Sequence, residues 1–345
     1  MSSKSIPEGL LLGLGNPLLD MSIFGDLDLL SRYNLQANNA VLATPEQHKL
    51  FDEIAENMSP SYIAGGATQN SVRIAQWLLE SSKATTFMGG VGDDKFRHIL
   101  EEKARDVGVN VCYQVYPGVK TGLCAAVITG EDRSLITELG AAEHFCLEFI
   151  SRPENWAFVE KAKFFYIGGF LLSNSQDVVT AVAAHASSQK KTLVMNLHAT
   201  FLCHFFTDQN LDLMSHIDVL FGNGDEYTEL AKLMNMDASD LNVVALKVAS
   251  LPKINSDKPR VVVITQGKAP TIIATEGSVI EVPVKAIDPK IIKDTNGCGD
   301  AFVGGFLSQL VQGKPISECV RCGSYAAKVV IQNYGCTYPE HPDFS

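Results

Sequence analysis

The sequence predicts an α/β protein with a central, mostly parallel sheet flanked by helices, together with a small β lid. Short apolar, β-branched runs alternate with stretches of helical period along most of the chain. These runs show little in–out alternation, as expected for strands buried on both faces. Two segments, 17–64 and 112–142, interrupt this alternation and are therefore assigned to the lid.

The large α/β domain is expected to comprise residues 1–16, 65–111 and 143–345. Its clearest strands are expected at Leu10–Leu14, Phe164–Ile167, Leu193–Leu197, Val219–Phe221 and Arg260–Thr265. Its helices are expected at Gln69–Leu79, Lys95–Asp106, Ser175–Ser188 and Asp225–Met234. Strands and helices at this spacing are typical of parallel βαβ units.

The lid is expected to contain a β-hairpin. Its first segment, 17–64, includes polar, loop-like sequence around residues 34–39. Its second segment holds two strand-like runs, Leu123–Thr129 and Arg133–Glu138, joined by the turn-forming residues 130–132. We expect the two segments to pack together over the large domain.

Composition excludes several classes of function. The 345 residues include 28 Lys and Arg against 39 Asp and Glu, which gives a net charge of −11. This acidity argues against binding to nucleic acid or to an anionic membrane. No run is long and apolar enough to span a bilayer, and no secretory signal is recognised. The eight cysteines are therefore interpreted as reduced thiols of a cytoplasmic protein.

The most informative stretch is Asp294–Leu307, a glycine-bearing turn that opens into an apolar helix. Backbone amides at such a helix start, with the positive end of the helix dipole, can hold a transferring phosphoryl group. Asp300 in the first turn could accept the proton of an attacking hydroxyl. An Asp with a pKa of about 3.9 is a weak base, but the proton moves late in phosphoryl transfer. The alternative is that Asp300 simply caps the helix.

This block resembles the C-terminal signature of the ribokinase-like carbohydrate kinase family, and Gly65–Ser71 resembles that family's N-terminal glycine signature. Within the family, four stretches are similar to the eukaryotic branch that phosphorylates adenosine: Gly15–Asp20, Gly65–Ser71, Arg133–Ile136 and Gly335–Glu340. The resemblance covers essentially the whole chain. It implies a ribokinase-like fold, ATP and Mg²⁺ as cofactors, transfer to the 5′-hydroxyl of adenosine, and a monomer.

The resemblance also implies catalytic roles. Asp300 would be the base, and the amides of Gly297, Cys298 and Gly299 would form the anion hole. Arg133 would close over the phosphates with the lid. Cys298 stands where relatives usually have Ala, so its thiol is either sensitive to alkylation or an inert buried group.

For the acceptor, the resemblance assigns Asp20 and Asn16 to the sugar hydroxyls. Gly66 would let the sugar lie against backbone, and Asn70 would hydrogen-bond a hydroxyl. The residues matching the apolar wall around the purine are Leu135, Phe170 and Phe201. Without the resemblance, these polar residues would be read as turn residues and the aromatic ones as core.

For the donor, Asn223 and Glu226 match an Asn-x-x-Glu element that arranges Mg²⁺ and its waters. They follow the strand Asp218–Phe221, at the edge where α/β sheets bind ligands, yet the same pattern also fits a helix cap. The remaining matches are Thr265 and Gly267, expected under the ATP phosphates and ribose, and Asn296 and Asn333, expected beside the nucleotide base.

Two other functions remain open from the sequence. The first is a related kinase acting on another nucleoside or a sugar. The second is a non-catalytic nucleoside-binding protein that has kept the fold. The intact set of Asp300, the anion-hole residues, Asn223 and Glu226 favours catalysis, because a binding protein has no need of it.

Overall fold

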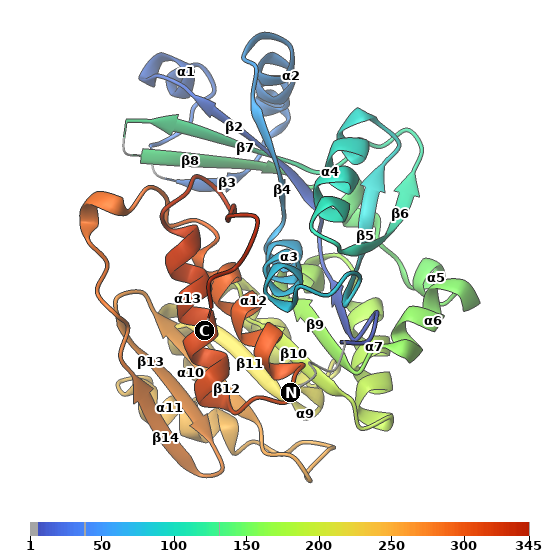
Figure 1. Cartoon of the computed structure of the whole chain (residues 1–345), viewed down its shortest axis with the longest axis vertical. Helices are drawn as coiled ribbons and strands as arrows, with labels where there is room; N and C mark the ends of the chain where they lie inside the picture. The colour runs from blue at the N-terminus through green and yellow to red at the C-terminus, as the bar shows by residue number, and fades with distance from the viewer. Residues whose placement is uncertain (1–5, 38, 131, 345) are drawn as a thin grey trace.

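The computed structural model describes residues 6–37, 39–130 and 132–344, and within these ranges it has two β-sheets (Figure 1). The larger sheet has nine strands in the order β14-β13-β12-β11-β10-β9-β1-β5-β6. The strands are β1 (Leu11–Leu14), β5 (Thr85–Gly92), β6 (Asn110–Tyr116), β9 (Phe164–Gly168), β10 (Thr192–Asn196), β11 (Val219–Asn223), β12 (Val261–Gln266), β13 (Ala269–Thr275) and β14 (Ser278–Val282).

The seven strands from β6 across the sheet to β12, namely β6, β5, β1, β9, β10, β11 and β12, pair in parallel. Strands β13 and β14 add antiparallel pairs at one edge. Strands β1, β5 and β9 to β11 are almost wholly buried, which explains why their sequences lack alternation. The prediction of an α/β fold on a mostly parallel sheet is confirmed.

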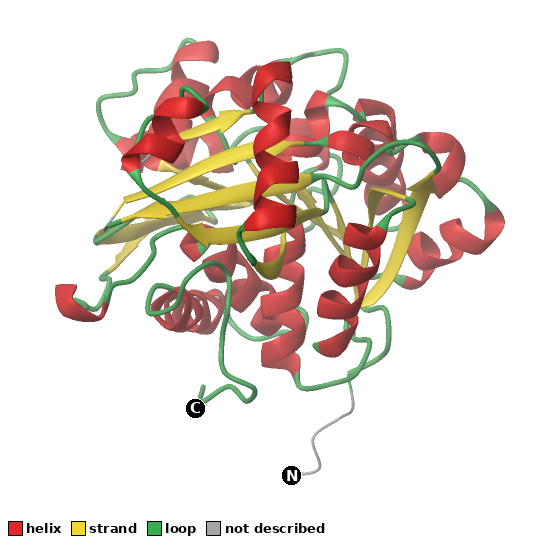
Figure 2. Ribbon diagram, turned by 90° about the horizontal axis from the view of Figure 1, so that it is seen from above, coloured by secondary structure: helices red, strands yellow, loops and turns green. Residues whose placement is uncertain are grey.

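Helices cover both faces of the large sheet (Figure 2). One face packs against α3 (Ala67–Leu79), α12 (Cys298–Leu310) and α13 (Ile316–Val330). The other packs against α7 (Gln176–Ser188), α10 (Gly224–Leu233) and α11 (Leu241–Ala249). The remaining α-helices are α1 (Leu27–Arg32), α2 (His48–Asn57), α4 (Lys95–Asp106), α5 (Leu147–Ile150), α6 (Pro153–Lys161), α8 (Cys203–Thr207) and α9 (Leu213–His216). Single 3-10 turns are η1 (Pro45–Gln47), η2 (Gly140–His144), η3 (Gly169–Ser173), η4 (Thr200–Leu202) and η5 (Pro289–Ile291).

The second sheet, called the small sheet below, has the strand order β3-β8-β7-β2-β4. Its strands are β2 (Leu18–Phe24), β3 (Ala40–Leu42), β4 (Ser61–Gly65), β7 (Leu123–Thr129) and β8 (Asp132–Glu138). Strands β7 and β8 pair antiparallel, so the predicted hairpin is confirmed. The expected start of the second lid segment, residue 112, falls inside β6. This strand belongs to the large sheet, because it pairs with β5 along its whole length, from Asn110 to Tyr116.

Glycines line the places where the chain crosses between the two sheets. A Cβ added to Gly66, whose φ is +85°, would lie 2.3 Å from the carbonyl oxygen of Asn16. A Cβ on Gly122 or on Gly140 would lie 2.6 or 2.4 Å from another backbone carbonyl oxygen. Only residues without a side chain allow the crossing strands to approach this closely.

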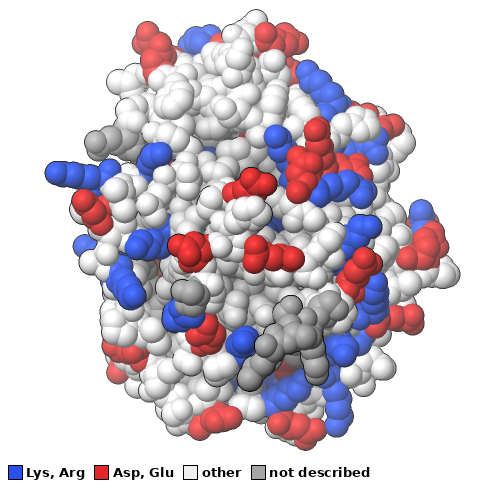
Figure 3. All heavy atoms as spheres, in the orientation of Figure 1, with Lys and Arg blue, Asp and Glu red and all other residues white. Residues whose placement is uncertain are grey.

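The surface agrees with the acidic composition. On the face drawn in Figure 3, basic and acidic side chains are interspersed rather than gathered into one basic surface. Among the helices that the structure describes, none is long and apolar enough to cross a membrane.

Candidate active site

The sequence-predicted residues meet at the carboxyl edge of the large sheet, beneath the small sheet. They come from the ends of β1, β9, β10, β11 and β12, from the first turns of α3 and α12, from the segment after α13, and from β2 and β8 of the small sheet. In open α/β sheets, this edge is where ligands bind.

The first group of polar residues surrounds the start of α3. Gly66 precedes this helix, and a Cβ on the neighbouring Gly65 would lie 2.1 Å from Oδ1 of Asp20. Asn16 is 7% exposed, and its Nδ2 donates to Oδ1 of Asn174 at 3.3 Å. The two glycines thus bring Asn16 and Asp20 against the backbone that leads into α3.

Asn70 joins this group to α12. Its Nδ2 donates to Oδ2 of Asp300 at 3.0 Å, although the two residues are 230 positions apart. Its Oδ1 is buried and has no hydrogen-bond partner among the described residues. An amide oxygen left in this state can accept a hydrogen bond from a bound hydroxyl group.

Burial changes the acidity of both carboxyl groups in this group. Burial raises the pKa of Asp300 to about 7, the Asn70 hydrogen bond lowers it, and the charge of Asp20 raises it further. Burial also raises the pKa of Asp20 to about 6, against the lowering effect of Arg133 and Arg73. Asp300 is therefore a stronger base than the unperturbed carboxylate assumed from the sequence.

The start of α12 has the shape expected of an anion site. Gly297 is the N-cap residue with a φ of +76°, and a Cβ on Gly299 would meet nothing within 4 Å. The Cys298 amide contacts the Thr295 carbonyl oxygen at 3.4 Å. Open space beside Gly299, at a helix start whose first amides have no partner within the helix, leaves room for a phosphoryl group.

The structure favours the inert reading of Cys298. Its thiol contacts the carbonyl oxygen of Asp294 at 3.8 Å and packs beside Ala301 and Cys336. Burial, with the nearby charge of Asp300, raises the pKa of the Cys298 thiol to about 12. The thiol is therefore protonated at neutral pH and a poor nucleophile.

Arg133 and Leu135 lie on the inner face of the small sheet. Ser134 and Ile136 are buried on its other face, so strand alternation turns residues 133 and 135 toward the large domain. Arg133 forms an ion pair with Asp294, and the two side chains are 8% and 3% exposed. The guanidinium was predicted from the resemblance to lie over phosphates, and its partner Asp294 was missed.

An aromatic wall lies opposite, on the large domain. The ring of Phe170 stacks on His198 with centroids 5.1 Å apart and contacts Phe201 at 6.4 Å. Phe170 and Phe201 are 37% and 65% exposed, so their rings form the outer part of the wall. Asn16 Nδ2 lies 3.5 Å from the Phe170 carbonyl oxygen, which places this wall beside the acceptor residues.

Sequence reasoning missed two further residues here. His198 has a φ of +65°; burial lowers its pKa to about 3, and its Nε2 lies 3.4 Å from the Tyr166 hydroxyl. Arg73 on α3 donates from NH1 to the carbonyl oxygen of Ala64 at 2.7 Å. A charged residue inside the apolar pattern of the predicted helix Gln69–Leu79 was the available signal for Arg73.

On the donor side, Asn223 and Glu226 form a closed capping box at the start of α10. Glu226 Oε2 accepts from the Asn223 amide and Oε1 from its Nδ2, both at 2.8 Å. Glu226 is 5% exposed, and burial raises its pKa. Because each Glu226 oxygen already accepts one hydrogen bond and keeps room for a water, this pair fits a Mg²⁺ that is held mainly by substrate phosphates and touches the protein through waters.

The other predicted donor residues lie in three places around this edge. Thr265 Oγ1 lies 3.5 Å from the Gly222 carbonyl oxygen at the end of β12, and Gly267 forms the exposed turn to β13. Asn296 Nδ2 donates to Asp294 Oδ1 at 2.9 Å. Asn333 Nδ2 donates to the Val329 carbonyl oxygen at 2.9 Å, so this amide ends α13.

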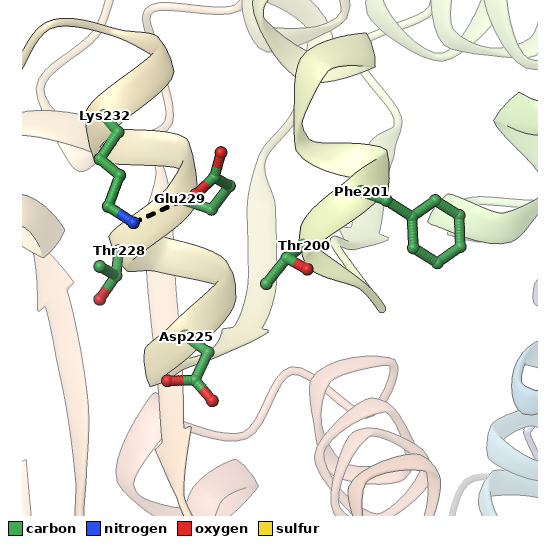
Figure 4. A pocket seen from close by; sticks show the side chains of 6 residues that line it. All are labelled: Thr200, Phe201, Asp225, Thr228, Glu229 and Lys232. Atoms are coloured by element: carbon green, nitrogen blue, oxygen red, sulfur yellow. Dashed lines mark hydrogen bonds and ion pairs between the residues drawn. The ribbon is translucent and has the colours of Figure 1, made fainter. Parts of the chain in front are cut away.

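A surface pocket of about 320 Å³ lies between α10 and η4 (Figure 4). Asp225, Thr228, Glu229 and Lys232 line it from α10, and Figure 4 shows the Phe201 ring pointing away from that helix. Thr200 and Phe201 line its other side from η4, so Phe201 borders both this pocket and the aromatic wall. Within the described ranges, no group of three His, Cys, Asp or Glu side chains is arranged to hold a metal ion.

Comparison with known proteins supports one family. Residues 36–343 match the pfkB family of carbohydrate kinases. Adenosine kinase 2 of Arabidopsis thaliana is 44% identical over 345 residues, covering 100% of both chains, and the Schizosaccharomyces pombe adenosine kinase is 39% identical, covering 96% of each. The structure of Anopheles gambiae adenosine kinase in complex with P1,P4-di(adenosine-5) tetraphosphate has a TM-score of 0.90 at 42% identity, covering 98% of this chain and 100% of that one.

A second solved structure, Schistosoma mansoni adenosine kinase in complex with adenosine and AMP, has a TM-score of 0.85 at 30% identity and covers 96% of this chain and 98% of its own. The chain therefore belongs to the pfkB family of carbohydrate kinases, which confirms the predicted ribokinase-like fold. Within that family it groups with the adenosine kinases of eukaryotes.

Proposed function

We propose that this protein is an adenosine kinase, which uses ATP to phosphorylate the 5′-hydroxyl of adenosine and yields AMP and ADP. Full-length similarity to the plant and yeast adenosine kinases supports the reaction. The observation that carries the chemistry is the hydrogen bond between Asn70 and Asp300, which fixes a carboxylate at the start of α12.

Adenosine binds between the two sheets in this proposal. The carboxylate of Asp20 accepts from the ribose diol, and the unpartnered Oδ1 of Asn70 accepts from a sugar hydroxyl. The purine lies between Leu135 of the small sheet and Phe170, whose ring is held by His198. The Anopheles ligand has two adenosines joined by four phosphates, which suits a nucleoside site and a nucleotide site on either side of a transfer point.

The transfer is in-line. Asp300 accepts the proton of the 5′-hydroxyl as the oxygen forms its bond to the γ-phosphorus and the bond from that phosphorus to the bridging oxygen breaks. ADP leaves with the electron pair of that bond, and Asp300 then returns its proton to solvent. The first amides of α12, from Gly297 to Gly299, stabilise the charge on the transferring group.

The donor residues act mainly by position. Mg²⁺, when bound, neutralises charge on the β- and γ-phosphates. Glu226, held by Asn223, accepts hydrogen bonds from water near those phosphates. Arg133 adds positive charge from the small sheet, and closure of that sheet excludes water that would otherwise hydrolyse ATP.

The test is ADP release measured with ATP and Mg²⁺ in the presence of adenosine, inosine, ribose or no acceptor. We expect release that depends on adenosine, with AMP as the second product. A preference for ribose or inosine would contradict the substrate and support the related-kinase alternative. Adenosine binding without ADP release would support the non-catalytic alternative.

A further inference from the structure

Asp294 carries the inference, because it joins three parts of the molecule through one buried carboxylate. It lies three residues before Gly297, and its side chain is 3% exposed. Its Oδ1 accepts from both the backbone amide and the side-chain Nδ2 of Asn296, each at 2.9 Å. These bonds fix the loop that enters the anion-binding start of α12.

The other oxygen of Asp294 reaches outside this loop. Oδ2 accepts from the amide of Gly335 at 2.8 Å, in the segment that follows α13. The same Oδ2 forms the ion pair with Arg133 of β8. One carboxylate therefore connects the small sheet, the C-terminal segment and the loop before Gly297.

Arg133 keeps donors to spare in this arrangement. A guanidinium has five N–H donors in a planar fork, and the Nε of Arg133 is buried without a hydrogen-bond partner among the described residues. Burial lowers the pKa of Arg133, while the charge of Asp20 raises it. Arg133 can thus hold Asp294 and still offer N–H groups to an anion beside α12.

We propose that Asp294 is a positioning residue that acts through Arg133, so that closure of the small sheet and ordering of the anion-binding turn occur together. The inference rests on the proposed phosphoryl transfer. Arg133 reaches Asp294 only when the small sheet lies against the large domain, and Asp294 then holds the loop to Gly297 in place. Asp294 itself touches neither adenosine nor the reacting phosphorus.

A double-mutant cycle between Asp294→Asn and Arg133→Met tests the coupling. The Asn side chain keeps an oxygen for Asn296 but places an NH₂ where Gly335 and Arg133 need an acceptor. We expect kcat to fall about 10-fold for Asp294→Asn, about 100-fold for Arg133→Met and no more than about 100-fold for both together. A combined loss near 1,000-fold would show independent roles and overturn the proposal.

Two readouts separate positioning from simple structural support. We expect Asp294→Asn to leave the adenosine KM within about two-fold while kcat falls, because the acceptor residues are untouched. A loss of adenosine affinity equal to the loss of kcat would overturn the proposal. A matched control is Asp52→Asn, which removes a carboxylate from an exposed pair with Lys120 and should change kcat less than about two-fold.

A length-compensated pair keeps the test decisive if Asp294→Asn folds poorly. Asp294→Glu lengthens the acidic side chain by one methylene, and Arg133→Lys shortens the basic side chain that it meets. Each change alone should lower kcat, and together they should recover turnover above either single variant; a double variant worse than both would overturn the proposal. Absence of turnover in the wild type would overturn the proposed function. If the wild type is active but the kcat losses of the two single variants multiply in the double variant, only the role of Asp294 is overturned.

Discussion

The two halves of the candidate site differ in how much of their hydrogen-bonding capacity is already used. On the acceptor side, Asn70 Oδ1 has no partner in the described structure, and Asp300 has one side-chain partner. On the donor side, Asn223 and Glu226 satisfy one another through three hydrogen bonds of 2.8 to 2.9 Å. The acceptor half is ready for a ligand, whereas the donor half is closed on itself.

From this difference we expect the two proposed substrates to meet different kinds of site. Unpartnered buried groups gain a full hydrogen bond when a ligand arrives, so the acceptor half favours direct contact. A ligand that bound directly to the capping box would have to break hydrogen bonds between Asn223 and Glu226. The donor half therefore favours contact through water or a metal ion. Adenosine should therefore bind in the absence of ATP, with little rearrangement of its polar residues.

We expect the greatest loss of kcat when the proposed base is removed from the acceptor half. Asp300→Asn should lower kcat by roughly 10³-fold while adenosine affinity changes less than about three-fold, because the amide keeps its shape but cannot take a proton. Single-turnover kinetics and calorimetric titration with adenosine measure the two quantities. Asp177→Asn, at the exposed start of α7, is the matched control. A variant within ten-fold of wild type would exclude Asp300 as the base.

The next effect follows from the raised pKa values of the acceptor half. Asp300, with a pKa of about 7, is protonated as the pH falls, so kcat should drop about ten-fold per pH unit below 7. Asp20, with a pKa of about 6, should add a rise in adenosine KM below pH 6. A flat profile of kcat between pH 5 and 8 would contradict the assignment.

The same shifts affect stability with the opposite slope. Both carboxyls have folded pKa values above the ordinary value of 3.8 for aspartic acid, so the stability they contribute is present below about pH 4. It is lost as the pH rises through 6 and 7. A thermal-unfolding series of wild type and Asp300→Asn should show a difference that grows over this window.

A smaller effect is expected on the donor half, where charge and capping can be separated. Glu226→Gln keeps a side chain that completes a capping box, whereas Glu226→Ala removes it. We expect both variants to lower kcat/KM for ATP by about ten-fold, and only Ala to lower the free energy of unfolding, by about 1 kcal/mol. Equal losses for adenosine and ATP would show that the two halves are not separable in this way.

The smallest effect is expected where the halves meet. Cys298→Ala should change kcat and both KM values by less than about two-fold, because the substitution keeps the backbone amide and the thiol contacts the Asp294 carbonyl oxygen. Treatment of the wild type with iodoacetamide at pH 7.5 should likewise leave activity intact, since the Cys298 thiol has a pKa of about 12. Inactivation that Cys298→Ala prevents would reverse this reading.

Much of the fold follows from local sequence. The apolar runs at Phe164–Ile167 and Leu193–Leu197 became β9 and β10 because a strand buried on both faces needs such a run. The predicted boundary at 112 falls inside β6, an edge strand that is only partly buried. Its place in the large sheet depends on pairing with β5, which no local pattern records.

In the candidate site, too, local sequence motifs predict some features, and contacts between distant elements determine the others. Asp300 and Asn70 could be assigned from motifs, yet the hydrogen bond that joins them spans 230 residues. Asp294 was missed as the partner of Arg133, and His198 as the support of Phe170, because each role exists only after distant elements pack. The Asn-x-x-Glu pattern fits both a cap and a donor site, and the structure shows that the cap is formed.

The glycine-lined crossings between the sheets have a consequence for inhibitors. Gly65 and Gly66 carry the chain from the small sheet into α3, and they also press against Asp20 and Asn16. The proposed acceptor site therefore lies at a crossing of the chain between the two sheets. We expect the bulk of an inhibitor bound near Gly66 to affect the angle between the two sheets as well as the affinity of that inhibitor. Two inhibitors of equal affinity but different bulk can then trap different degrees of opening.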